Sequence, residues 1–187
     1  MSLQFVINSS LLFFLSELVL IIAKRSKKKG IKTRNDKRSL ILFWITIPLS
    51  LSFGFFMANY QKWDVFNKSI AIFGLSLYFI GIVIRWISII QLKKEFTVDV
   101  AISTNHKLKT NGIYKHIRHP SYLGLFLICF GISIALNSII SVLIITIPIL
   151  LLLIYRISIE ENVLLKEFGN TYEEYMLKTY KMIPKLY

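Results

Sequence analysis

The chain has 187 residues, of which 55% are hydrophobic, and 23 Lys and Arg against 10 Asp and Glu give it a net charge of +13. Such an apolar chain is not a disordered basic tail, and it is too short for two large soluble domains. Its single cysteine, Cys129, excludes a disulfide framework and a cysteine-based zinc site. Basic chains often bind nucleic acid, but here the basic residues flank long apolar runs. We therefore expect a membrane protein with no nucleic-acid partner.

Three apolar runs that are long enough to cross a bilayer lie in the first half of the chain. The run over 5–23 carries Glu17 as its only charge, and the run over 39–59 carries none. A third run covers 69–92, with Arg85 towards its far end. Each run predicts one transmembrane helix.

The uncharged stretch from 122 to 155 is too long for one span and matches two short ones. Asn137 and Ser138 mark the expected turn of a helical hairpin, with spans over 122–136 and 139–155. The predicted fold is therefore an all-α integral membrane protein with about five transmembrane helices. It would end in a C-terminal helical hairpin with a cofactor-binding loop and tail on the cytosolic side.

The basic residues predict how these spans are oriented, because Lys and Arg concentrate in cytosolic loops. Nine lie within 24–38, six within 93–121 and five from 156 onward, but only two within 60–68. Alternating spans then place the N-terminus outside and the C-terminus in the cytosol of a multi-pass protein, which we treat as a single domain over 1–187. The first basic loop is interpreted mainly as a topology signal and as an attraction to anionic headgroups of membrane lipids.

Polar residues form two clusters on the predicted cytosolic side, over 106–122 and 156–175. They flank the hairpin, whose ends lie together, so we expect the clusters to meet at the membrane surface. The spacing of His116 and His119 resembles a metal-binding pair, but Pro120 interrupts helical geometry there and no second group of ligands completes a site. No metal is predicted, and the motifs of P-loop, dinucleotide-binding and serine-hydrolase sites do not occur.

Arg156 and Glu160 are four residues apart, so on a helix they share one face. They directly follow an apolar span, where a charged group is costly unless it has a function. Arg offers a fork for a carboxylate, and Glu offers an acceptor for an ammonium group. The pair is typical either of a surface ion pair or of a site that holds an amino-acid-like group or two ligands of opposite charge.

Two ordered motifs flank the hairpin. The first reads His-x-Leu-x-x-x-Gly-x-Tyr-x-x-x-Arg-His-Pro-x-Tyr from His106 to Tyr122. The second reads Arg-x-x-x-Glu-Glu from Arg156, followed by Phe-Gly-x-x-Tyr-x-x-Tyr ending at Tyr175. Through these motifs the chain resembles the isoprenylcysteine carboxyl methyltransferase family, in particular its short five-span prokaryotic members.

The resemblance implies methyl transfer from S-adenosylmethionine, with a cofactor-binding part over about 99–187. The acceptor would be a lipophilic or prenylated molecule that arrives from the bilayer. Arg156 and Glu160 would be the catalytic residues, with Arg156 also binding the substrate carboxylate and Glu160 accepting from the cofactor's ammonium group. The residues implied to bind the cofactor are His106, Lys107, Leu108, Lys109, Tyr114, Arg118, His119, Pro120, Ser121, Tyr122 and Glu160.

A carboxylate acceptor is already ionised at neutral pH, so it needs no general base, and catalysis would come from positioning and exclusion of water. Three other acceptor types stay open: a phospholipid amine, a lipid enol or phenol, and a thiol. An amine, phenol or thiol would require a base such as Glu160, Glu161 or His119. A non-catalytic protein that binds anionic lipids and a membrane reductase are further alternatives, and the oligomeric state does not follow from the sequence.

Overall fold

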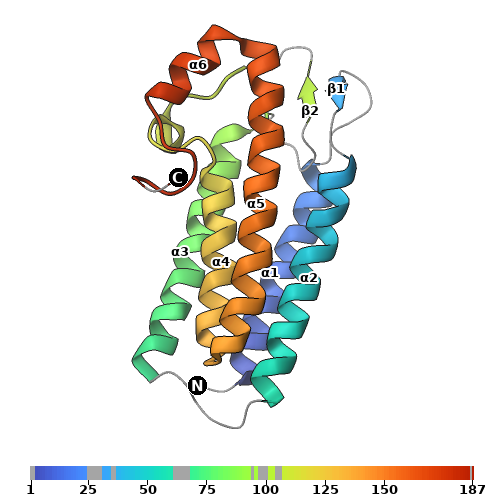
Figure 1. Cartoon of the computed structure of the whole chain (residues 1–187), viewed down its shortest axis with the longest axis vertical. Coiled ribbons are helices and arrows are strands. Elements are labelled where there is room, and N and C mark those ends of the chain that lie inside the picture. The colour runs from blue at the N-terminus through green and yellow to red at the C-terminus, as the bar shows by residue number, and fades with distance from the viewer. Residues whose placement is uncertain are drawn as a thin grey trace.

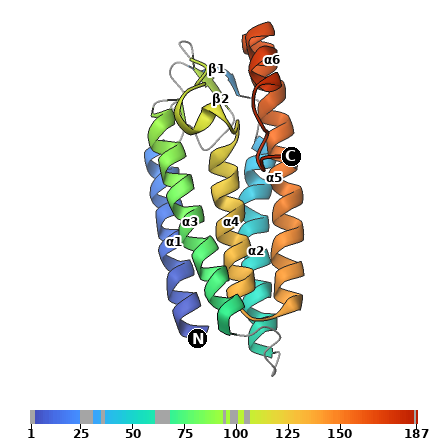
Figure 2. The same ribbon diagram turned by 90° about the vertical axis from the view of Figure 1, so that its left-hand side faces the viewer.

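Five long helices stand side by side along the longest axis of the molecule (Figure 1). The computed structural model describes residues 3–24, 31–34, 37–60, 68–93, 95–96, 101–103, 107–185 and 187. In chain order the long helices are α1 (Leu3–Lys24), α2 (Lys37–Tyr60), α3 (Lys68–Leu92), α4 (Pro120–Ala135) and α5 (Ile139–Phe168). The 3₁₀ helix η1 (Gly112–Lys115) and α6 (Asn170–Leu177) lie together at one end of this bundle, as both views show (Figure 2).

The structure confirms the helical membrane fold, with one helix over each predicted span. Among the described residues, α2 from Arg38 onward, α3 and α5 are long and apolar enough to cross a membrane, and α4 is a shorter apolar helix. Two short strands were not predicted: β1 (Ile31–Arg34) and β2 (Ala101–Ser103) pair antiparallel beside the upper end of the bundle.

The predicted hairpin turn is present between α4 and α5. Asn137 adopts a left-handed backbone conformation with φ of 59°, and the Ser138 side chain accepts a hydrogen bond of 3.2 Å from the backbone N–H of Ser141. The second helix of the hairpin extends beyond the predicted span end at 155. Its 30 residues rise about 45 Å, which exceeds the roughly 30 Å of a hydrocarbon core. The end of α5 therefore stands outside the membrane.

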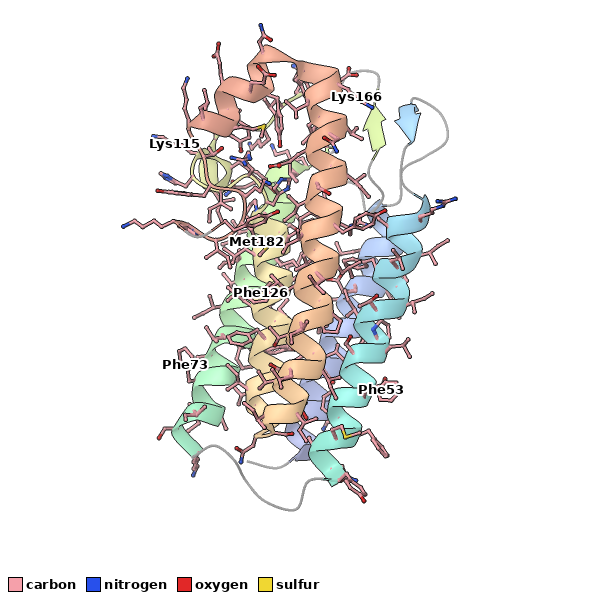
Figure 3. The ribbon with its side chains drawn as sticks, viewed as in Figure 1. Phe53, Phe73, Lys115, Phe126, Lys166 and Met182 are labelled. Atoms are coloured by element: carbon pink, nitrogen blue, oxygen red, sulfur yellow. The ribbon has the colours of Figure 1, made fainter. Side chains whose placement is uncertain are left out.

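The outer surface of the bundle is apolar where lipid would surround it. Phe53 on α2 and Phe73 on α3 are 55% and 56% exposed, and Figure 3 shows both pointing away from the neighbouring helices. Lys115 and Lys166 extend from the end that carries α6 (Figure 3). This separation of exposed apolar and charged side chains is typical of a helical membrane protein with one polar end.

Helices α3 and α4 approach closely because glycines face each other along their contact. A Cβ on Gly81 would lie 2.7 Å from the carbonyl oxygen of Gly124, and a Cβ on Gly131 would lie 2.5 Å from that of Gly74. The glycines are seven residues apart in each helix, so both pairs lie on one face. Small residues let membrane helices pack through their backbones, since lipid offers little hydrophobic drive for association.

A buried ion pair attaches α1 to the rest of the bundle. Arg85 of α3 binds both carboxylate oxygens of Glu17 at 2.6 Å, and its remaining nitrogen donates to the carbonyl oxygen and the hydroxyl of Ser121 at the start of α4. Glu17 and Arg85 are each 6% exposed. The two charges that stood alone in their predicted spans thus neutralise each other, which buried charges require.

We expect Gly131→Ala to destabilise the fold by about 1–3 kcal/mol, because the added methyl group meets the backbone of α3 and the helices must separate. Ser76→Ala, on the exposed side of α3, is the matched control and is expected to have little effect. Thermal unfolding in detergent measures both. Equal midpoints for the two variants would contradict backbone contact between α3 and α4.

Candidate functional site

The loop before α4 is fixed by contacts with the end of α3. Gly112 has a φ of 64°, and a Cβ there would lie 2.1 Å from the Gln91 side-chain oxygen. The same oxygen accepts a hydrogen bond of 3.1 Å from the backbone N–H of Ile113. The Tyr114 hydroxyl donates to the Ser88 carbonyl at 3.2 Å. These contacts hold the loop of the first motif against the membrane helices.

The two predicted polar clusters do meet, because the loop and the C-terminal tail pair through their backbones. The N–H of Arg118 donates to the carbonyl of Tyr180 at 2.8 Å, and the N–H of His119 donates to that of Lys181 at 2.9 Å. In return, the N–H of Tyr180 donates to the carbonyl of His116 at 2.9 Å. The Tyr175 hydroxyl of α6 adds a bond of 2.6 Å to the Tyr114 carbonyl.

The Glu161 carboxylate is the centre of this junction. Its Oε1 accepts from the Arg118 guanidinium at 2.9 Å and lies 3.2 Å from Nε2 of His119, and its Oε2 lies 3.4 Å from the Lys181 ammonium. Burial by itself would raise the pKa of Glu161, but hydrogen bonds and charge from His119 and Arg118 lower it to about 2. Glu161 therefore stays ionised at neutral pH and joins α5, the loop and the tail.

The Arg118 guanidinium is committed to the tail as well as to Glu161. Its Nη1 donates to the carbonyl of Met176 at 3.0 Å and also binds the carbonyl and hydroxyl oxygens of Thr179. Within the tail, the Lys181 ammonium, which also contacts Glu161, lies over the Tyr187 ring, 4.7 Å from its centroid. Arg118 was predicted to bind the cofactor, and in the structure it contacts Glu161, the end of α6 and the tail.

Arg156 lies below this junction, where α5 passes from the membrane to the polar end. It is 3% exposed and donates to the hydroxyl of Tyr122 at 3.3 Å and to that of Ser39 at 3.2 Å. Its guanidinium also lies over the Phe43 ring, 5.1 Å from the centroid. Helices α2, α4 and α5 thus converge on one buried cation at the membrane boundary.

Glu160 is one helical turn beyond Arg156 and remains partly open. Its side chain is 33% exposed, and its Oε1 lies 4.0 Å from Nδ1 of His119, which is beyond hydrogen-bonding distance. The His119 ring stacks on Tyr122, with centroids 5.8 Å apart. One helix turn rises about 5.4 Å. The buried cation of Arg156 and the accessible anion of Glu160 are therefore separated by about this distance along the axis of α5.

Tyr172 of α6 carries a buried hydroxyl without a hydrogen-bond partner in the described part of the chain. Its side chain is 1% exposed and its ring packs against Tyr175, with centroids 5.9 Å apart. Burial, followed by the negative charges of Glu161 and Glu160, raises the pKa of this phenol. A neutral, buried and unpaired donor is rare in a folded protein, which makes this hydroxyl a candidate contact for water, an ion or a polar ligand.

The remaining predicted residues occupy different parts of this end of the molecule. His106 lies outside the described residues. Lys107 is exposed, and Leu108 and Lys109 are half-buried. The buried residues that begin α4 are Pro120, at its first turn, and Ser121, which binds Arg85.

Comparison with known proteins agrees with this arrangement. The family described as phospholipid methyltransferase matches residues 69–171, which is more than half of the chain and includes Arg85, η1, the α4–α5 hairpin and Glu161. The chain belongs to this family. The match also includes α3, which lies outside the two sequence motifs.

Within the phospholipid methyltransferase family, the similar proteins confirm the resemblance to isoprenylcysteine methyltransferases. The "Protein-S-isoprenylcysteine O-methyltransferase" of Schizosaccharomyces pombe is 32% identical over 72% of this chain and 56% of its own length. Protein-S-isoprenylcysteine O-methyltransferase B of Arabidopsis thaliana is 31% identical over 70% of this chain and 64% of its own length. The chain thus spans less than two thirds of these relatives.

A solved structure shares the fold. It is described as the eukaryotic intramembrane Ras methyltransferase ICMT, isoprenylcysteine carboxyl methyltransferase, without a monobody. The two superpose with a TM-score of 0.59 at 27% identity, over 79% of this chain and 51% of the other. The shared part is therefore an integral-membrane helical core, and the solved structure extends well beyond it.

Several residues at the site were not predicted from the sequence. Ser39 and Phe43 of α2 contact Arg156, although α2 had been interpreted only as an apolar span. Thr179 and Lys181 of the tail bind Arg118 and Glu161. No local pattern marks these four, because each contact forms between segments that are distant in the chain.

The lowered pKa of Glu161 predicts a loss of stability in acid. A carboxyl group with a lower pKa in the folded state stabilises the protein above its unfolded pKa of about 4.5, and this stabilisation disappears as the pH falls towards 2. The thermal midpoint in detergent should fall over this interval, and Glu161→Gln should reduce the fall while lowering the midpoint at neutral pH. Glu174→Gln, at an exposed position of α6, is the control. An unchanged acid dependence in Glu161→Gln would contradict this role.

Proposed function

We propose that this chain is an integral-membrane methyltransferase that uses S-adenosylmethionine to methylate the carboxylate of a lipophilic, isoprenylcysteine-like acceptor. The observation that carries the proposal is the order of two charged side chains along α5, from the membrane towards the aqueous end. Arg156 is buried at the membrane boundary, and Glu160 is accessible one turn closer to the aqueous end. The relatives' names support the reaction class.

The order of the charges suits two reactants of opposite solubility. An oily acceptor with a carboxylate approaches from the bilayer, and Arg156 offers donors to that carboxylate from a largely dry environment. A water-soluble cofactor approaches from the polar end, where Glu160 can accept from its ammonium group. Arg156 and Glu160 would therefore fix the two reactants at adjacent levels, and orientation of this kind supplies a large part of a catalysed rate.

The described residues fit a polar cofactor. When bound, S-adenosylmethionine supplies an electrophilic methyl group on a sulfonium centre. The unpaired Tyr172 hydroxyl offers a donor, and the Glu160 carboxylate offers an acceptor. The His119 ring stacks on Tyr122 and lies close to Glu160, and this stack would help to exclude water. The other residues proposed to contact the cofactor are Lys107, Leu108, Lys109, Tyr114, Arg118, Pro120 and Ser121, and His106 is proposed from its motif alone.

Glu161 is not suited to act as the base that an amine acceptor would require. The name of the matching family makes a phospholipid amine the second candidate. An amine must lose a proton before it attacks, and a useful base has a pKa near the working pH. The pKa of Glu161 is lowered to about 2, so Glu161 is a poor base. A carboxylate is already ionised and avoids this requirement.

The proposed orientation places the site in the cytosol. Figure 3 places Lys115 at the end with α6, and the exposed Lys178 directly follows α6. Cytosolic ends of membrane proteins are rich in Lys and Arg. This arrangement gives an external N-terminus and a cytosolic C-terminus. We also propose that residues 1–187 form a single domain.

Two variants separate the proposed roles on α5. Glu160→Gln should weaken S-adenosylmethionine binding by roughly tenfold or more, because it removes a charge-assisted hydrogen bond. Arg156→Gln should leave cofactor affinity within about twofold and abolish turnover of N-acetyl-S-farnesylcysteine. Calorimetric titration in detergent and transfer of a labelled methyl group measure the two effects.

Glu173→Gln, at an exposed position of α6, is the control and should change neither quantity. Unchanged cofactor affinity in Glu160→Gln would remove Glu160 from the site. Full turnover of the carboxylate acceptor by Arg156→Gln would contradict the assigned role of Arg156.

A further inference from the structure

A pair of opposite charges lies buried in the apolar part of the bundle, away from the junction around Glu161. Glu17 of α1 and Arg85 of α3 are each 6% exposed, and each is the only charged residue of its predicted apolar run. Burying two charges is costly, and apolar residues of similar volume often make a folded protein equally or more stable. Stability alone therefore does not explain the pair, and a charge within a membrane span is a candidate for a functional role.

The Arg85 guanidinium divides its donors between Glu17 and the first turn of α4. Its Nε and Nη2 each donate to one carboxylate oxygen of Glu17 at 2.6 Å. Its Nη1 donates to the carbonyl oxygen of Ser121 at 3.2 Å and to the Ser121 hydroxyl at 3.1 Å. Because the guanidinium is planar, the two bonds to Glu17 fix the direction in which Nη1 points. Glu17 therefore orients Arg85 towards Ser121.

The backbone from which Arg85 extends is also held against α4. A Cβ on Gly124 would lie 2.7 Å from the backbone nitrogen of Arg85, so the two helices are in direct backbone contact at this level. Gly124 lies about one turn after Ser121 in the same helix. Arg85 thus has a fixed origin on α3 and a fixed orientation from α1, and both determine where the first turn of α4 lies.

The first turn of α4 carries side chains of the proposed methyl-transfer site. Tyr122, the residue after Ser121, accepts a hydrogen bond of 3.3 Å from Nε of Arg156. The ring of His119, directly before the helix, stacks on Tyr122 with centroids 5.8 Å apart. Consecutive residues of a helix project about 100° apart, so Arg85 and Arg156 contact this turn from different sides.

We propose that Glu17 and Arg85 are positioning residues for methyl transfer, because they hold the first turn of α4 where its contact with Arg156 requires it. This inference rests on the proposed function, and both residues act through Ser121 without contacting a reactant. Displacement of the turn would move the Tyr122 hydroxyl to which Arg156 donates. Small misplacements of groups that orient reactants cost a large part of a catalysed rate, so the expected loss is in turnover.

A double substitution removes the pair without leaving one buried charge alone. Glu17→Leu with Arg85→Met replaces both charges with apolar side chains, so the thermal midpoint in detergent should stay equal or rise. The kcat for N-acetyl-S-farnesylcysteine, per cofactor site counted by calorimetric titration, should fall about tenfold or more because Ser121 loses both donors. An unchanged kcat per site would overturn the proposal and leave the pair a structural contact alone.

A second comparison keeps the test decisive if the double variant folds poorly. Arg85→Lys retains a positive charge beside Glu17, but an ammonium lacks the planar fork that also reaches Ser121, so kcat per site should again fall about tenfold. Gly131→Ala, towards the other end of α4, is the matched control. It should lower the thermal midpoint without changing kcat per site. Equal values of kcat per site in Arg85→Lys and Gly131→Ala would overturn the proposal.

The outcomes also distinguish this inference from the proposed function. Methyl transfer by the unaltered protein, with the same kcat per site in both Arg85 variants, would overturn the positioning role alone. Absence of cofactor binding and of methyl transfer in the unaltered protein would overturn the proposed function, and the positioning role with it.

Discussion

The arrangement of the polar end depends on one buried carboxylate, that of Glu161. It sits on the part of α5 that extends beyond the membrane and contacts Arg118, His119 and Lys181. A buried carboxylate is stable only when its oxygens are satisfied by donors and positive charge. Those donors come from the loop before α4 and from the tail after α6. The need to satisfy Glu161 therefore brings together two segments that the hairpin alone would only place near each other.

These contacts bury Glu161, whereas its neighbour in the motif stays partly open. Glu160 is the next residue of α5 but faces a more open environment, with its side chain 33% exposed. Adjacent glutamates in one motif thus differ in burial and contacts because a helix turns about 100° per residue. Arg156 lies four residues before Glu160, one helical turn away, and faces the membrane helices. The candidate site is a single helix face, with Glu161 holding the surrounding chain around it.

The charges inside the bundle follow the same rule of compensation. Glu17 and Arg85 form a two-bond ion pair, and Arg85 also binds Ser121 directly after the His119–Pro120 turn. The pair therefore links α1 to the beginning of α4, close to the site. Backbone packing of glycines between α3 and α4 fixes the other side of α4. Together these contacts place the first turn of α4, which carries Ser121 and Tyr122.

Much of this architecture was predictable, because membrane spans and their turns depend on local composition. Five apolar stretches predicted five helices, and Asn137 marked the hairpin turn that the structure confirms. The motifs identified the polar end because their order is specific. The contacts of Ser39 and the pairing of Glu17 with Arg85 were not predictable. They join residues far apart in the chain, and a lone Ser or Glu in an apolar run has no pattern that names its partner.

The spacing of glycines in α3 and α4 was only partly predictable from the sequence. Gly74 and Gly81 repeat at seven residues, as do Gly124 and Gly131, and that repeat is visible in the sequence. It indicates a close helix contact but does not identify the two helices that share it. The difference in burial between Glu160 and Glu161 likewise required coordinates, since both follow the same apolar span.

In the proposed function, a buried arginine at the membrane boundary presents a lipophilic carboxylate to a methyl donor. The most direct measurement is incubation of the purified protein with methyl-labelled S-adenosylmethionine and a mixture of farnesylcysteine and an amine phospholipid, followed by mild base. The account predicts label in farnesylcysteine that base releases as methanol, as expected for a methyl ester. Base-stable label in the phospholipid amine, or no transfer to either acceptor, would contradict it.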